Sequence, residues 1–168
     1  MRAVVLALCL CFAVLLTGCA SGVNGGLILT AADQERAIAR YKEALARDPD
    51  DWLLHRRIGL GYFELADYPQ AEQSLQEAQR LSPGEPVSLL YLGLARIGKG
   101  ERGAGLDLLA SYRWPGKFYH QKFVQDEAKR LRKHPEEPAG EVIRDILDAL
   151  EAGKREQHRI DREMIRGL

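Results

Sequence analysis

Apolar side chains recur every three or four positions along most of the chain, and this spacing predicts helices. Thr30 has a hydroxyl of the kind that caps a helix start, and Asp33 lies where an acidic side chain faces that start. We therefore expect a helix over residues 31–47, which Pro49 follows. A second helical stretch is followed in the same way by Pro83. The pattern favours an all-α fold.

The helical pattern has a period of 34 residues. Pro49 and Pro83 are separated by this distance, and the pair Ile58-Gly59 returns after it as Leu92-Gly93. The small and bulky positions of one helix recur with the same displacement, so that Ala37, Tyr41 and Ala44 correspond to Ala71, Leu75 and Ala78. A fixed period of this length indicates stacked helical hairpins, each of which buries its apolar face against its neighbours.

These residues resemble the tetratricopeptide repeat (TPR), a family in which two antiparallel helices pack through small side chains. The resemblance covers residues 31–112, with one complete unit over residues 51–85. The second helix of one unit precedes this complete unit, and a degenerate unit follows it. The resemblance implies that Gly59 and Ala71 lie where the paired helices approach closely, whereas Gly105 replaces the usual alanine in the degenerate unit. We expect a short TPR-type solenoid.

Residues 113–168 are expected to form helices that cap this solenoid. Trp114-Pro115-Gly116 interrupts the array, and the apolar spacing then predicts a helix over residues 117–133 that ends before His134-Pro135. The side chains predicted to point inward are Phe118, Tyr119, Phe123, Val124, Ala128 and Leu131.

Pro138 begins a long final helix, in which seam positions alternate in steps of three and four as in a coiled coil. The seam consists of Ile143, Ile146, Leu150, Gly153, Gln157, Ile160 and Met164. Because Gly153 and Gln157 interrupt it, we expect the helix to pack on the end of the solenoid. The alternatives are pairing with a second copy of the chain and a frayed tail.

The start of the chain has the pattern of a secretory signal peptide. Arg2 precedes an apolar stretch over residues 3–16, which is too short to span a bilayer as a stable helix. The stretch ends in Leu16-Thr17-Gly18-Cys19, which resembles the bacterial lipobox. The resemblance implies that residues 1–18 are removed and that Cys19 receives covalent lipid.

Residues 19–30 are expected to form a flexible tether, because residues 20–29 contain three glycines and no charge. Ala20 stands where an inner-membrane retention signal of the lipoprotein family would have aspartate. In a Gram-negative host, the resemblance therefore implies an anchor in the outer membrane that faces the periplasm. The three cysteines are Cys9, Cys11 and Cys19, so we expect no disulfide after processing.

Composition and motifs argue against several function classes. The 24 basic and 24 acidic residues balance, which gives no electrostatic footprint for nucleic acid. The four histidines lack the spacing of metal ligands, and neither a phosphate-binding loop nor a nucleophile elbow occurs. We therefore expect that the protein is not an enzyme and that it has no metal site and no cofactor, apart from the covalent lipid on Cys19.

In the family that the repeat resembles, the first helix of each unit lines a concave groove. The corresponding residues here are Leu53, Arg56, Leu60, Phe63, Glu64, Val87, Leu90, Leu94 and Ile97. A mostly apolar groove of this kind suits a helix or an extended peptide of a partner. We therefore expect an envelope adaptor or assembly factor that binds another protein. Two alternatives stay open. The final helix of the chain itself fills the groove, or the protein is a structural lipoprotein that self-associates through that helix.

Overall fold

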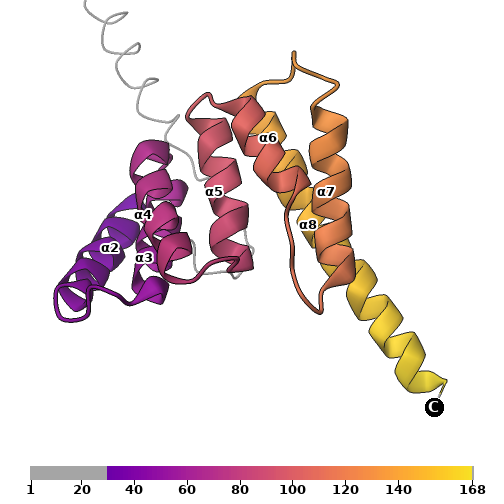
Figure 1. The fold of residues 1–168 in the computed structure, drawn as a ribbon, viewed down its shortest axis with the longest axis horizontal. Helices are drawn as coiled ribbons and strands as arrows, with labels where there is room; N and C mark the ends of the chain where they lie inside the picture. The colour runs from indigo at the N-terminus through magenta and orange to yellow at the C-terminus, as the bar shows by residue number, and fades with distance from the viewer. Residues whose placement is uncertain (1–29, 168) are drawn as a thin grey trace, which may run out of the picture.

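The computed structural model describes residues 30–167, which form seven helices and no strand (Figure 1). The all-α expectation is confirmed. The signal peptide, the lipobox and residues 19–29 of the expected tether lie outside the described residues. The helices are α2 Ala31–Leu45, α3 Trp52–Glu64, α4 Tyr68–Leu81, α5 Pro86–Gly98, α6 Arg102–Ala110, α7 Phe118–Leu131 and α8 Ala139–Arg166.

Local side-chain caps fix where the early helices begin. Thr30 and Asp33 form a reciprocal capping box at α2, in which the Asp33 carboxylate accepts the Thr30 backbone N–H at 3.0 Å. Asp51 accepts hydrogen bonds from the backbone N–H groups two and three residues after it, at the start of α3. Glu85 does the same at the start of α5, and it lies 34 residues after Asp51. The period therefore extends to the helix caps.

Two hairpins pack in the same way, with equivalent residues 34 positions apart. In the α3–α4 hairpin, a Cβ atom added to Gly59 would lie 2.6 Å from Cγ of Leu75. In the α5–α6 hairpin, a Cβ atom added to Gly93 would lie 2.8 Å from Cγ of Leu109. Each added atom would also lie 3.3 Å from the carbonyl oxygen twelve residues later. Each glycine therefore permits a close helix contact that a larger residue would prevent.

The core is one cluster of buried side chains that runs from α3 to α8. Each helix packs against the next one along the chain, and α8 also returns to pack against α5. As a result α5 is the central helix, and its residues 92–95 are all buried. The carboxylate of Glu72 on α4 accepts a hydrogen bond from the Arg96 guanidinium at 2.9 Å and forms an ion pair with the Lys99 ammonium. These two contacts join α4 to α5.

The two C-terminal helices form an antiparallel pair. Val124, Ala128 and Leu131 of α7 are fully buried, as the apolar spacing predicts. Tyr119 and Phe123 are half-buried. Phe118 was expected to point inward, but it is 62% exposed. It is the first residue of α7 and lies at the edge of the contact with α8, so no helix covers it.

The first half of the α8 seam packs against α7 and the core, with Ile143, Ile146 and Leu150 buried. A Cβ atom added to Gly153 would lie 2.5 Å from the Tyr119 carbonyl oxygen, so the two backbones approach closely there. The Gln157 side-chain oxygen accepts the Tyr119 backbone N–H at 3.5 Å. The two positions that interrupt the coiled-coil pattern are thus contacts with α7. Beyond them α8 continues past the N-terminal end of α7 (Figure 1).

Candidate partner-binding surface

The α5 half of the predicted groove is closed. Leu90, Leu94 and Ile97 are fully buried, and they belong to the same cluster as Val142 and Ile146 of α8. α8 contacts α5, as expected if the final helix of the chain fills the predicted groove. This corrects the expectation that Leu90 and Leu94 line an open groove, because a helix from far along the chain covers α5.

Phe63 is also part of the interior, with 9% of its surface exposed. Its ring makes edge-to-face contacts with Tyr68 of α4 at a centroid distance of 5.7 Å and with Tyr91 of α5 at 5.0 Å. Such edge-to-face pairs stabilise the junction of three helices. Phe63 was expected to be the main anchor for a partner, and the structure places it in the junction of α3, α4 and α5 instead.

Arg56 is occupied by contacts within the chain. Its guanidinium donates to Glu85 at 2.9 Å and stands 5.2 Å from the centre of the Trp52 ring. Burial raises the pKa of Glu85, but hydrogen bonds from Ser88 and from the backbone of Val87, together with the charge of Arg56, hold the pKa below its ordinary value. The ion pair therefore fixes α3 to the start of α5. Leu53, which was also predicted to line the groove, is half-buried.

An open hollow of about 210 Å³ lies between α2 and α3. Of the predicted groove residues, it contains Leu60 and Glu64, of which Leu60 is half-buried and Glu64 is exposed. The complete lining is Gln34, Ala37, Tyr41, Arg57, Leu60, Gly61 and Glu64. The guanidinium of Arg57 stands 5.6 Å from the centre of the Tyr41 ring. The structure thus brings together two of the predicted residues, and it adds α2 residues that the sequence analysis did not assign.

The face of α2 that borders this hollow is more exposed than the equivalent faces of α4 and α6. Ala37, Tyr41 and Ala44 are half-buried. Their counterparts 34 residues later, Ala71, Leu75 and Ala78, are fully buried under α3. The difference arises because no described helix precedes α2. The sequence did contain this signal, since the first unit lacks a recognisable first helix.

Two further hollows border the other sides of α2. One, of about 690 Å³, lies between α2, α3 and α4 and includes Lys42 and Tyr62, whose Nζ and Oη atoms are 2.6 Å apart. The other, of about 500 Å³, includes Ile38 and Ala39 of α2 together with Leu65. The edge of the array at α2 is therefore bordered by hollows on several sides. Hollows of this kind can accommodate side chains of a partner.

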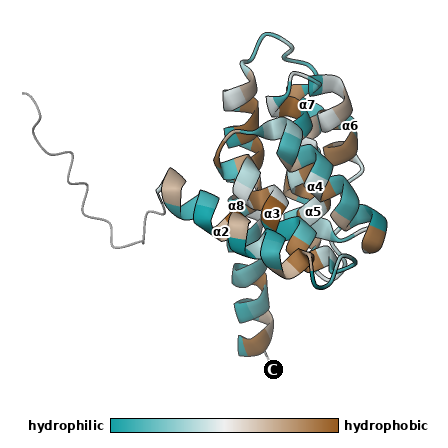
Figure 2. Ribbon diagram, turned by 90° about the vertical axis from the view of Figure 1, so that its left-hand side faces the viewer, coloured by the Kyte–Doolittle hydropathy of each residue, from teal (hydrophilic) through white to brown (hydrophobic). Residues whose placement is uncertain are grey.

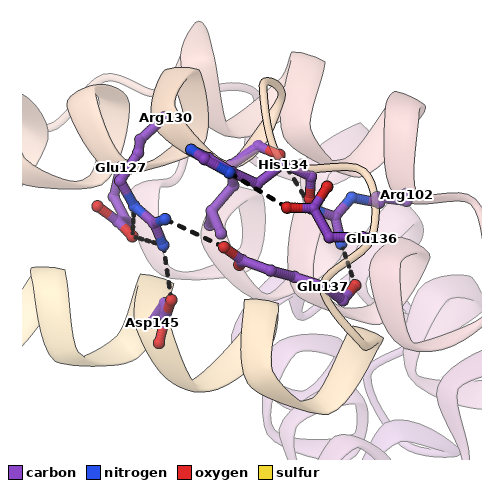
Figure 3. Close-up of polar contacts among 8 residues, drawn as sticks. Arg102, Glu127, Arg130, His134, Glu136, Glu137 and Asp145 are labelled. Atoms are coloured by element: carbon purple, nitrogen blue, oxygen red, sulfur yellow. Dashed lines mark hydrogen bonds and ion pairs between the residues drawn. The ribbon is translucent and has the colours of Figure 1, made fainter.

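A cluster of charged residues joins the α7–α8 turn to α6 (Figure 3). The Arg102 guanidinium of α6 donates to the carbonyl oxygens of Leu131, His134 and Glu137 at 2.6–2.9 Å. These carbonyls lie at and just beyond the end of α7, where backbone acceptors lack helical partners. Arg130 pairs with carboxylates of three residues: Glu127, Glu137 and Asp145. Its contacts hold the turn in place, so we assign this cluster a structural role.

The structure gives no catalytic arrangement for the one buried histidine. The Nδ1 atom of His120 has no hydrogen-bond partner among residues 30–167, and its ring packs 5.0 Å from that of Trp114. Burial lowers the pKa of His120, and the charges of Lys117 and Lys154 lower it further. The imidazole is therefore neutral at neutral pH and fits a packing role.

Within the described part of the chain, no group of three or more His, Cys, Asp and Glu side chains is arranged to hold a metal ion. No described helix has both the length and the apolar character needed to cross a membrane. No family model matches the sequence, and no curated protein and no solved structure matches it either.

Proposed function

We propose that this protein is a lipid-anchored, TPR-like adaptor of the bacterial envelope, which binds another protein at the surface around α2. The observation that carries the proposal is the open face of α2. Ala37, Tyr41 and Ala44 are half-buried, whereas the equivalent positions of the following hairpin are fully buried. The lipobox-like Leu16-Thr17-Gly18-Cys19 supports the anchor.

The repeated packing supports a TPR-like array. The contacts of Gly59 with Leu75 and of Gly93 with Leu109 share one geometry and one spacing. Asp51 and Glu85 cap their helices in the same manner at that spacing. Agreement between sequence period, close contact and cap is expected when each unit is one copy of the same hairpin.

The lack of a described helix before α2 suggests the chemistry of the partner. In the register of the repeat, the helix before α2 would fall on residues 18–30, which contain four glycines and therefore have low helix propensity. A partner helix with a glycine or alanine at its crossing point would meet Ala37 and Tyr41 as Gly59 meets Ala71 and Leu75. Apolar side chains on either side of that small residue would enter the hollow beside Leu60.

Cys19 carries the anchor in this proposal. Cys19→Ser should release the protein from membranes or leave it as an unprocessed precursor, because a serine hydroxyl cannot form the thioether to the lipid. Membrane fractionation with radiolabelled palmitate measures both outcomes. Labelling and processing equal to those of the wild type would contradict the lipid anchor, and separation of inner and outer membranes would test the outer-membrane location.

Photo-crosslinking in cells tests the partner surface separately from the anchor. A photoreactive amino acid replaces Gln34, which lines the α2–α3 hollow, or Asp107, which is exposed on α6. We expect a discrete adduct from position 34 and none from position 107, and mass spectrometry would identify the protein. Tyr41→Ser should reduce the adduct at least tenfold, because loss of an aromatic anchor commonly costs about 2 kcal/mol of binding.

Circular dichroism of Tyr41→Ser checks that the variant is folded. The surface assignment fails if position 34 gives no adduct, if positions 34 and 107 give the same adduct, or if Tyr41→Ser leaves the adduct unchanged. None of these results depends on the lipidation of Cys19, which the fractionation experiment measures independently.

A further inference from the structure

The C-terminal part of α8 projects beyond the rest of the described structure (Figures 1 and 2). The hydrogen bond between the Tyr119 N–H and Gln157 marks where α7 begins alongside α8. α8 continues to Arg166, so residues 159–166 extend past α7 by about 12 Å at 1.5 Å per residue. Within residues 30–167, no other helix lies beside this projection (Figures 1 and 2).

The large apolar side chains that are exposed in the described part of the chain all lie at this end. Phe118 at the start of α7 is 62% exposed, and Met164 and Ile165 on the projection are 59% and 72% exposed. Phe118 is next to Tyr119, whose backbone contacts α8. Exposed apolar side chains gathered at one end of a molecule indicate a contact with another apolar phase or surface.

The same end is basic. We define the basic end as residues 113–122 and 154–167, two segments that meet where α7 contacts Gly153 and Gln157 of α8. It carries eight Lys and Arg residues against three Asp and Glu residues. The other described residues carry 15 basic against 21 acidic side chains. Two acidic partners lie just outside these segments, Asp126 for Lys122 and Glu151 for Lys154, and with them included the basic end still has more basic than acidic residues.

Two arginines of the projection are available to an anionic surface, whereas Arg155 lines an α7–α8 hollow that also contains Asp126, Glu127, Asp145 and Asp148. Arg162 and Arg166 are exposed and form no ion pair with any residue in the 30–167 range. They are spaced four residues apart, so they share one face of α8. Ile165 lies three residues after Arg162, one helical turn away on a neighbouring part of the surface. Met164, two residues after Arg162, lies on the opposite side of the helix from the arginines, so arginine and apolar side chains occupy different sides of the tip.

We propose that the basic end contacts a membrane surface that contains anionic phospholipids. The side chains of Phe118, Met164 and Ile165 enter the boundary between headgroups and acyl chains, and the arginines bind lipid phosphates. Each basic residue near such a surface contributes severalfold in affinity, and long arginine side chains reach the phosphates while their stems contact apolar groups. This is the chemistry by which basic amphipathic helices bind membrane interfaces.

Two observations favour lipid over a second copy of this chain. A stable protein interface buries roughly 1,200–2,000 Å², and a projection of about 12 Å with two exposed apolar residues, with Phe118 beside it, is too small to supply that area. The projection also carries a net positive charge, and like charges disfavour pairing of two identical ends. The contact needs no lipid on Cys19. With that lipid in place, the chain would touch the membrane at both ends of the fold, because α2 and the projection lie at opposite ends (Figure 1).

Vesicle flotation tests the proposal with the chain from Ala20 onward, which retains all described residues and lacks the lipidation site. We expect binding to vesicles with one third phosphatidylglycerol, weak binding to pure phosphatidylcholine, and loss of binding at high salt. Arg162→Gln with Arg166→Gln should weaken binding on the order of tenfold, and Met164→Ser with Ile165→Ser should weaken it severalfold.

The matched control is Arg40→Gln with Arg47→Gln, which removes the same charge from exposed positions in and just after α2. It should bind like the wild type. Every substituted side chain is exposed, so we expect all variants to fold. Circular dichroism checks this. The proposal is overturned by absence of binding to anionic vesicles, by equal binding to both vesicle types, or by equal loss in control and test variants. A dimer in sedimentation velocity that Met164→Ser with Ile165→Ser disrupts, without vesicle binding, would assign this end to self-association instead.

Discussion

Replacement of Gly153 by alanine places a methyl group where α8 is closest to α7. The added Cβ would lie 2.5 Å from the Tyr119 carbonyl oxygen and 2.9 Å from the His120 Cα atom. Both neighbours are backbone atoms, so a side chain cannot rotate away to relieve the contact. Alanine adds up to about 1 kcal/mol of helix propensity, whereas forcing an extra methyl group into a packed core costs about 1–3 kcal/mol. Because the backbone must move, we expect a net loss of about 1–2 kcal/mol in the free energy of unfolding.

Gly140→Ala in the same helix is the matched control. No atom lies within 4 Å of a Cβ added there, and the residue is exposed in the first turn of α8. We expect this variant to gain up to about 0.5 kcal/mol, so the two alanine variants should differ by roughly 2 kcal/mol. Urea denaturation of the chain from Ala20 measures this as a separation of about 1 M between midpoints. Equal midpoints, or a higher midpoint for Gly153→Ala, would refute the close contact between α7 and α8.

Three other substitutions test the packing. Ala71→Glu places a carboxylate at a fully buried helix crossing and should cost several kcal/mol, so that thermal melts by circular dichroism show loss of folding or a greatly lowered Tm. Phe63→Ala removes a buried ring and should cost about 3 kcal/mol in urea denaturation; unchanged stability would mean that Phe63 is on the surface. Burial raises the pKa of Glu72, but Lys99 and Arg96 lower it more, so the net pKa is below 4.5 and Glu72 stabilises the fold above that pH. Glu72→Gln should therefore be less stable than wild type at pH 7, and the difference should shrink as the pH falls below 4.5; a difference independent of pH would contradict the ion pairs.

The sequence predicted the hairpins well because they depend on local chemistry. Thr30 and Asp33 cap α2 as the pattern indicates, and the small residues at 59 and 71 lie where two helices meet. In both cases the two residues that make the contact are separated by a few positions or by less than one repeat period. A local sequence pattern therefore includes both of them. The 34-residue period could be read from the chain for the same reason.

The candidate site was harder to predict because long-range contacts decide which faces stay open. Val142 and Ile146 cover the region of α5, yet nothing in their own spacing specifies which helix they will contact. The exposed face of α2 depends on the lack of a preceding helix in the described structure, which motif matching does not weigh. Phe118 shows the same limit, since its exposure depends on where the contact of α7 with α8 ends.

The composition of α5 nevertheless contained a sign that it would be covered. In the register of the repeat, Arg56, Arg57 and Glu64 of α3 correspond to Leu90, Tyr91 and Gly98 of α5. The charged positions of one first helix are thus replaced by uncharged ones in the next. A helix that is apolar on nearly all sides is stable only when it is buried on nearly all sides. Since α4 and α6 can cover only part of α5, the chain needs another apolar helix beside it, and the seam of α8 meets that need. A groove predicted from repeat register should therefore be accepted only where the lining helix keeps a polar border, as α3 does beside α2.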